Sequence, residues 1–150
     1  MIQIRSANEE DYEVIAGFQV KMAMETENFE LDQETVKKGV LSVMQDPHKG
    51  KYFVAVDETN IVSSLLVTYE WSDWRNKWVL WIQSVYVLPE FRKLGIFRQM
   101  YLNVKEWAEQ DADVGGVRLY VDKSNKRAIE VYKRLGMNGE HYQVFEWMTD

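Results

Sequence analysis

Cysteine is absent from this 150-residue sequence, and histidine occurs only twice, as His48 and His141. The lack of cysteine excludes disulfides, a thiolate nucleophile and thiolate metal ligands. Two histidines far apart in the chain argue against an imidazole-based metal centre, so we predict no metal site. No apolar run approaches the roughly 20 residues that a membrane span needs, and the N-terminus lacks the long apolar segment of a secretory signal. We therefore expect a cytoplasmic protein with no membrane partner.

Positive charge is in deficit, since the formal net charge is −6. Nucleic-acid binding needs a basic face, so we predict no nucleic-acid partner. An acidic protein accommodates cationic small molecules more easily, although solubility alone also explains such a charge. Repeats and linkers are absent too, which predicts a single domain over residues 1–150. Hydrophobic residues make up 46% and aromatic residues 13%, enough for a packed core and with room for a homodimer.

The hydrophobic pattern predicts an α/β (α+β) fold in which helices flank a mixed sheet, in the order β-αα-β-β-β-α-β-α-β. Ser6 and Glu9 have the spacing of a capping box before the first helix, and Asp46-Pro47 should end the second. The expected strands are 2–5, 52–56, 61–70, 78–87, 117–121 and 142–148, and the later helices run from 95 to about 112 and from 125 to 135.

Residues 84–98 form the most informative segment, because an apolar strand there ends at Pro89 and a basic loop leads into a helix near Gly95. The first N–H groups of a helix have no internal partner and carry partial positive charge, so such a junction can bind a pyrophosphate. Gly95 would let the backbone approach the phosphates, and Arg92 and Lys93 add charge. A simple strand-to-helix turn with a solvated basic loop explains the same residues.

This segment resembles the signature of the GNAT superfamily of acyl-CoA-dependent N-acetyltransferases, Arg/Gln-x-x-Gly-x-Gly/Ala after a strand that ends in proline. Pro89, Arg92 and Gly95 match, whereas Phe97 stands where a second Gly or Ala is usual. The helical spacing places Phe97 on the apolar face with Tyr101, away from the phosphates.

A second stretch resembles the other GNAT signature, a strand, an Asn near a helix start and Tyr-x-x-x-Gly-Phe at the helix end. It runs from Arg118 through Asn125 and Tyr132 to Gly136, with Met137 in place of Phe. Two signatures in the right order and setting are far more specific than either alone. The resemblance therefore implies a GNAT-like, mostly antiparallel central sheet and acetyl-CoA as the acyl donor.

By the same resemblance, the pantetheine arm of acetyl-CoA bonds the backbone of Val85, Tyr86 and Val87 like an added strand. The pyrophosphate would be received by the loop and helix start, made of Arg92, Lys93, Leu94, Gly95, Ile96, Phe97 and Arg98.

Tyr132 is the candidate general acid for the departing thiolate, because a phenol stays protonated at neutral pH. Its spacing from Ala128 and Leu135 also suits a core aromatic. Asn125 resembles the CoA-contacting Asn of the family and equally suits a helix cap.

No single side chain is required as the general base. Glu70 is the nearest carboxylate to the central strand, and it is also explained as a solvated residue. Gln83 and Ser84 suit a relay water, and ordered water alone can take the amine proton.

Acidic and aromatic residues suggest a wall for a small acceptor amine that can be cationic, although a solvated acidic loop and an aromatic core explain them as well. They are Glu25, Glu27, Asn28, Phe29 and Glu30 in one segment and Trp71, Asp73 and Trp74 in another.

We thus expect an N-acetyltransferase in which a primary amine attacks acetyl-CoA directly in a ternary complex. The alternative is a non-catalytic acyl-CoA-binding sensor or interaction module.

Overall fold

The computed structural model describes residues 1–149, and the chain divides into two compact units, Met1–Arg118 and Leu119–Asp150. The sheet has five strands in the spatial order β1-β2-β3-β4-β5, and its first four strands pair antiparallel. The strands are β1 (Ile2–Ser6), β2 (Lys51–Asp57), β3 (Asn60–Ser72), β4 (Lys77–Val87) and β5 (Val114–Leu119). The predicted mixed and mostly antiparallel fold class is confirmed.

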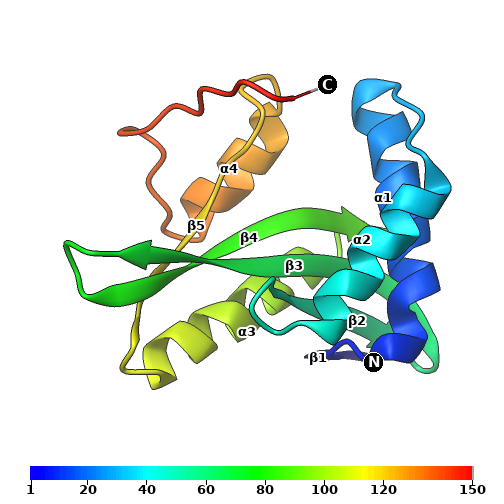
Figure 1. Ribbon diagram of the computed structural model, residues 1–150, viewed down its shortest axis with the longest axis horizontal. Helices are drawn as coiled ribbons and strands as arrows, with labels where there is room; N and C mark the ends of the chain where they lie inside the picture. Colours follow the sequence, from blue (N-terminus) through cyan, green and yellow to red (C-terminus); the bar gives the residue numbers. More distant parts are fainter. Residues whose placement is uncertain (150) are drawn as a thin grey trace. The chain divides into compact units, whose positions relative to one another are not determined.

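Three helices pack on the two faces of the sheet in the first unit. Helices α1 (Tyr12–Glu27) and α2 (Gln33–Gln45) lie on one face, and α3 (Ile96–Gln110) lies on the other (Figure 1). Short 3-10 turns, η1 (Glu9–Asp11) and η2 (Pro89–Phe91), precede α1 and α3. Helices α1 and α2 thus connect β1 to β2 on one face, and α3 connects β4 to β5 on the other.

The helix ends are fixed by local polar residues. The capping box at the start of the first helical segment uses Asn8 and Asp11, not the predicted Ser6 and Glu9, because β1 continues through Ser6. Asp32 caps α2 by accepting a hydrogen bond from Thr35 N, and α2 ends before Asp46 as predicted. Local sequence therefore sets these boundaries to within a few residues.

The core has two layers because successive residues of a strand point to opposite faces. Ile15, Val40, Val54 and Leu66 pack together beneath α1 and α2. On the α3 face, the ring of Trp107 lies against Phe53 and Tyr69, with centroid distances of 6.0 and 6.2 Å. Both faces of the central strands are therefore covered over most of their length.

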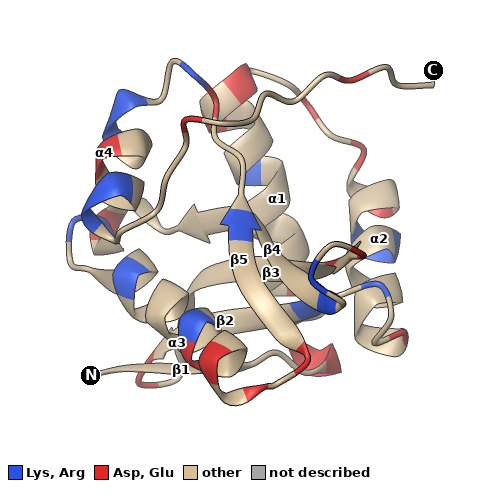
Figure 2. Ribbon diagram, turned by 90° about the vertical axis from the view of Figure 1, so that its left-hand side faces the viewer, with Lys and Arg blue, Asp and Glu red and all other residues tan. Residues whose placement is uncertain are grey.

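The second unit contains α4 (Lys126–Arg134), which begins at Asn125 and is closed by Gly136 with φ of +88°. Figure 2 shows blue at both ends of this helix, where its basic residues Lys126, Arg127, Lys133 and Arg134 lie. Positive side chains at a helix N-terminus oppose the helix dipole. Lys126 and Arg127 therefore cost free energy in an isolated helix, and a nearby anion would offset that cost.

The predicted strand over Tyr142–Met148 is wrong, because no strand is assigned to this segment. Its apolar residues are strongly exposed, as in Phe145 at 90% and Trp147 at 86%. An alternating pattern gives strand propensity, but a strand forms only when a partner edge completes its hydrogen bonds. Val114–Leu119 also begins three residues before the predicted 117–121, because Gly115 and Gly116 obscure its start.

Candidate functional site

The end of β4 is distorted by a β-bulge. Ser64 pairs with Tyr86 and Leu66 pairs with Gln83, so two residues, Ser84 and Val85, oppose a single residue of β3. Ser84 has φ of +54°, the left-handed region that L-residues rarely occupy. A bulge bends its strand and redirects its backbone groups, which makes the segment after Ser84 a candidate binding edge.

Beyond the bulge, backbone groups alternate between the two edges of β4. Leu88 N donates to Val62 O at 2.9 Å, and the carbonyl of Tyr86 accepts a bond from Ser63 Oγ at 2.7 Å, so both residues bond to β3. Because the direction alternates along a strand, Val85 and Val87 direct their N–H and C=O groups to the opposite edge. Of the three residues predicted to bind pantetheine, Val85 and Val87 therefore direct main-chain groups away from β3, toward a possible ligand. The main-chain carbonyl of Tyr86 bonds to β3 instead.

This opposite edge extends beyond the reach of β5. Strand β5 has 6 residues against 11 in β4 and starts beside its beginning, where Trp78 N donates to Asp113 O at 2.8 Å. At about 3.3 Å per residue, β5 ends near the level of Ser84. The main-chain groups of Val85 and the N–H of Val87 can therefore bond an extended ligand in place of a strand, while Val87 O accepts a bond from Arg92 Nε.

The turn after β4 gathers backbone donors. Lys93 and Gly95 have φ of +66° and +78°, and Gly95 stands at the N-cap of α3 without a side-chain cap. The first backbone bond into the helix runs from Gln99 N to Gly95 O at 3.1 Å. A side-chain methyl at Gly95 would meet no atom within 4 Å. Left-handed residues ahead of an uncapped helix make a concave anion site with open space above it.

Ile96 and Phe97 at the start of α3 differ in exposure. Ile96 is 2% exposed and belongs to the core, so only its backbone can contribute to an anion site. Phe97 is half-buried, and its ring lies 6.3 Å from that of Tyr101. The expected direction of Phe97, along the apolar face of α3, agrees with this position.

Arg92 makes contacts that the sequence did not indicate. Its Nε donates to Val87 O at 2.8 Å, its second terminal nitrogen lies 3.1 Å from Glu25 Oε1, and its guanidinium lies 5.4 Å from the ring centre of Tyr86. Burial, followed by a hydrogen bond to Glu25, raises the pKa of Tyr86 to about 12. The hydrogen bond from Tyr86 and the contact with Arg92 lower the pKa of Glu25.

Glu70 lies in a polar row on the α1 and α2 face of β3 and β4. Its carboxylate accepts bonds from Trp81 Nε1 at 2.9 Å and from Arg118 at 2.7 Å, and Gln83 bonds Thr68 next to it at 2.7 Å. The bond from Trp81, followed by that from Arg118, lowers the pKa of Glu70. Glu70 is therefore ionised at neutral pH, a weak base but a good partner for a cation.

The two other predicted site residues belong to the second unit. Tyr132 is half-buried on α4, and burial raises the pKa of its phenol. Asn125 caps α4 by accepting a bond from Ala128 N at 3.1 Å. Of the two interpretations of Asn125, the helix cap is therefore observed.

The two segments expected to form an acceptor wall are not brought together. Glu25 lies at the Val87 end of the β3–β4 hairpin, whereas Trp71 pairs with Trp78 near the opposite end (Figure 1). Eight residues separate Tyr86 from Trp78, which is about 25 Å along a strand. Trp74 is 92% exposed at the hairpin turn. These tryptophans and Glu25 therefore cannot contact one small molecule.

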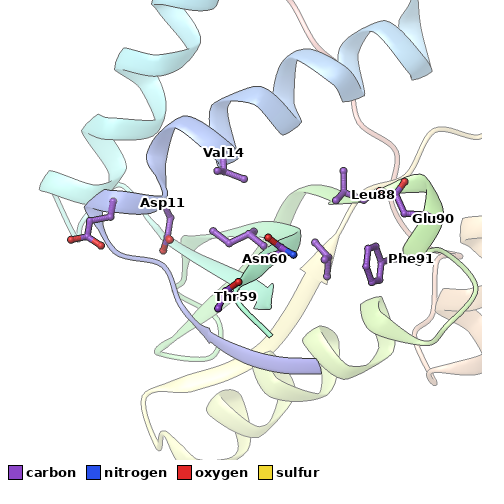
Figure 3. Close-up of a pocket in the computed structure, with 10 residues that line it drawn as sticks. Asp11, Val14, Thr59, Asn60, Leu88, Glu90 and Phe91 are labelled. Atoms are coloured by element: carbon purple, nitrogen blue, oxygen red, sulfur yellow. The ribbon is translucent and has the colours of Figure 1, made fainter. Parts of the chain in front are cut away.

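A cavity of about 580 Å³ opens between the start of α1, the β2–β3 turn and η2 (Figure 3). Val14, Leu88 and Phe91 line it with apolar surface, and Glu10 and Glu90 add carboxylates. It adjoins the turn after β4 without including Arg92 or Gly95. Among residues 1–149, no three His, Asp or Glu side chains gather to hold a metal ion. None of the helices in the same range has the length and apolar character that a membrane crossing requires.

Sequence reasoning missed the partners of Arg92 and the role of Ser63. Glu25 is 67 positions from Arg92, and nothing local couples them. Two adjacent serines, Ser63 and Ser64, interrupt an otherwise apolar strand, and this pattern was the signal in the sequence for an irregularity. In the structure both side chains are fully buried.

Comparisons with known proteins agree with this geometry. The model of the Acetyltransferase (GNAT) family matches residues 6–137. The solved structure of a possible acetyltransferase from Clostridium difficile 630 is 41% identical, covers 100% of this chain and 99% of its own, and superimposes with a TM-score of 0.92.

Two curated relatives match over shorter stretches. The probable N-acetyltransferase san of Drosophila melanogaster is 35% identical over 38% of this chain, and the thialysine N-epsilon-acetyltransferase of Bos taurus is 34% identical over 51%. These stretches span 31% and 44% of the two relatives' own lengths.

Proposed function

Because the chain belongs to the GNAT family of acetyltransferases, we propose that it is an N-acetyltransferase that moves the acetyl group of acetyl-CoA onto a primary amine. The acceptor is a small molecule or an exposed amino group, and the amine attacks directly in a ternary complex. The observation that carries the proposal is the bulge at the end of β4, after which Val85 and Val87 face away from β3, followed directly by the uncapped start of α3 at Gly95.

These two features suit the two ends of one carrier. An extended pantetheine arm can bond Val85 and Val87 as an added strand, and the backbone from Lys93 to Arg98 then meets the pyrophosphate. Arg92, Lys93 and Arg98 add positive charge. A backbone N–H at the bulge supports the oxyanion that forms when the amine attacks the thioester carbonyl.

Tyr132 serves as the general acid in this proposal. The amine nitrogen forms a bond to the acetyl carbon, the carbon–sulfur bond breaks, and the thiolate takes the phenolic proton of Tyr132. Tyr132 keeps its proton at neutral pH, since burial raises the pKa of its phenol above the usual value. The proton lost by the amine passes to ordered water, with Glu70 as the nearest proposed carboxylate.

The acceptor is a cationic amine that approaches the polar row around Glu70. The ionised carboxylate, with its lowered pKa, favours a positive ligand, and the half-buried ring of Trp81 offers an adjacent aromatic surface. The Bos taurus relative is named for acetylating an ε-amine, which supports an aliphatic primary amine as the acceptor class.

Asn125 in the second unit is also proposed to contact CoA, as the resemblance to the family implies. Lys126 and Arg127 follow Asn125 and place two positive charges at the positive end of the helix dipole. A phosphate group of CoA would offset this unfavourable arrangement. Asn125 then contributes as the residue that fixes the helix start.

A non-catalytic acyl-CoA-binding module is the second candidate function. The contacts of Glu70 favour it, because the bond from Trp81 and the ion pair with Arg118 lower the pKa of this carboxyl and weaken it as a base. In this case acetyl-CoA binds, but no amine is acetylated.

An amine panel with detection of free thiol tests the proposal. Acetyl-CoA is incubated with the protein and aliphatic diamines, amino acids, aminoglycosides or peptide N-termini, and the released CoA thiol is measured. We expect thiol release that depends on one class of amine. Binding of acetyl-CoA without release for any amine would support the second candidate instead.

A further inference from the structure

Three side chains from separate parts of the chain meet at the end of β4. The guanidinium of Arg92 lies 3.1 and 3.4 Å from the two carboxylate oxygens of Glu25 and 5.4 Å from the centre of the Tyr86 ring. Glu25 belongs to the last turn of α1, Tyr86 to β4 and Arg92 to the turn after η2. The cluster therefore ties α1 to the junction that carries the proposed carrier site.

Arg92 also reaches the proposed pantetheine edge. Its Nε donates to Val87 O at 2.8 Å, on the edge of β4 that faces away from β3. The guanidinium is thus held by Val87, by Glu25 and by the Tyr86 ring. Among residues 1–149 its remaining terminal nitrogen makes no hydrogen bond, so that donor stays available to a phosphate oxygen.

Without these contacts, the position of Glu25 near the C-terminus of α1 would destabilise the helix. Carboxylates near a helix C-terminus oppose the dipole, and the last turn of α1 contains Glu25 and Glu27 but no basic residue. Both residues are exposed, but Glu27 has no ion pair among the described residues, whereas Glu25 pairs with Arg92. The two carboxylates thus differ in contacts while sharing charge and location.

We propose that Glu25 is a positioning residue for acetyl-CoA. It holds the Arg92 guanidinium against Val87 O and Tyr86, and so keeps the end of β4 and the following turn in the geometry that receives the carrier. This inference rests on the proposed function. It assigns Glu25 to the carrier site and not to the wall for the acceptor amine.

An opposite role for the same contact makes a different prediction. If Glu25 merely occupied Arg92 until a phosphate displaced it, removal of the carboxylate would strengthen carrier binding. If Glu25 orients Arg92, removal weakens binding. The sign of the change therefore separates the two roles.

The test compares Glu25→Gln and Glu25→Ala with Glu27→Gln in steady-state kinetics and in calorimetric titration with acetyl-CoA. Because the pair is partly exposed, we expect KM and Kd for acetyl-CoA to rise about threefold in Glu25→Gln and about tenfold in Glu25→Ala. The kcat should stay within about twofold, and Glu27→Gln should match the wild type in its affinity for acetyl-CoA. Melting temperatures check that each variant folds. If Glu25→Ala does not fold, the near-isosteric Glu25→Gln still tests whether the carboxylate supports carrier binding.

A double variant adds a second readout. With Arg92→Ala in place, Glu25→Ala should change acetyl-CoA affinity by less than about twofold, because a positioning residue acts only through its partner. Equal or tighter binding by the Glu25 variants, or additive losses in the double variant, would overturn the inference. A wild-type protein that binds no acetyl-CoA would instead remove the proposed function, and this inference with it.

Discussion

Arg118 donates a hydrogen bond to the carboxylate of Glu70 at 2.7 Å, across 48 positions of the sequence. Together with the bond from Trp81 Nε1, this contact lowers the pKa of Glu70, so its negative charge persists throughout the neutral range. Glu70 is therefore better suited to attract a cationic acceptor than to remove a proton from it.

Replacing Glu70 with Gln should raise KM for the amine about tenfold, since the charge is lost while the side-chain shape is kept. The rise of rate with pH between about 6 and 9 should remain, because a carboxyl with a lowered pKa does not titrate there. Initial rates of thiol release over that range measure both effects. Glu109→Gln on α3 is the matched control. Loss of the rise would identify Glu70 as the base, and an unchanged KM would contradict its role toward the acceptor.

Asp11 should contribute a pH-dependent part of stability. It is 6% exposed and accepts bonds from Arg5 Nη1 at 2.7 Å and from Asn8 N at 2.8 Å. The Arg5 bond, against the opposing effect of burial, lowers the pKa of Asp11 below the usual 3.8. A lowered folded-state pKa stabilises the protein above the unfolded value, and this contribution is lost as the pH falls through the folded value.

Asp11→Asn should therefore reduce the free energy of unfolding by about 1–3 kcal/mol at neutral pH. The difference from the wild type should shrink as the pH falls below about 4, where the carboxyl becomes protonated. Urea unfolding at several pH values measures it, with Glu9→Gln as the control. A difference that stays constant with pH would refute the electrostatic explanation.

Gly95 and Gly136 offer a matched pair for the phosphate turn. Both have positive φ, +78° and +88°, and an added methyl meets no atom within 4 Å at either position. Gly→Ala should cost about 1 kcal/mol of stability at each site, because the left-handed conformation is strained for Ala. Only Gly95→Ala should also weaken acetyl-CoA binding, by about tenfold, since its backbone faces the proposed pyrophosphate. Equal affinities in calorimetry would argue against this turn as the phosphate site.

Tyr132→Phe should slow thiol release about 100-fold at saturating substrates, because the departing thiolate loses its proton donor. The affinity for acetyl-CoA should change little. Tyr12→Phe is the control, since the one hydrogen bond of the Tyr12 phenol within residues 1–149 is to the exposed Glu13. Single-turnover measurements separate this step from product release, and an unchanged rate would remove Tyr132 from catalysis.

The sequence predicted correctly those helix ends that depend only on neighbouring residues. The α3 start at Gly95 and the α4 cap at Asn125 follow from residue types that fix backbone angles or satisfy helix ends. The strand expected over Tyr142–Met148 failed because strand formation depends on a partner edge, which the pattern of one segment does not reveal.

The candidate site was predicted in its backbone but not in its side-chain contacts. The turn from Arg92 to Gly95 is encoded by adjacent residues, whereas the Glu25 and Arg92 pair forms only when α1 packs beside the end of β4. The bulge at Ser84 is similarly a product of pairing with β3, since no residue within β4 requires it. Both features depend on contacts between residues that are far apart in the sequence, which the spacing of residue types does not reveal.

Calorimetric titration of the wild-type protein with acetyl-CoA tests the central claim most directly. The account predicts saturable one-site binding with a Kd in the micromolar range, and competition by CoA. Absence of heat together with an unchanged melting temperature in the presence of either ligand would contradict the assignment of the β4 edge and the α3 start as a carrier site.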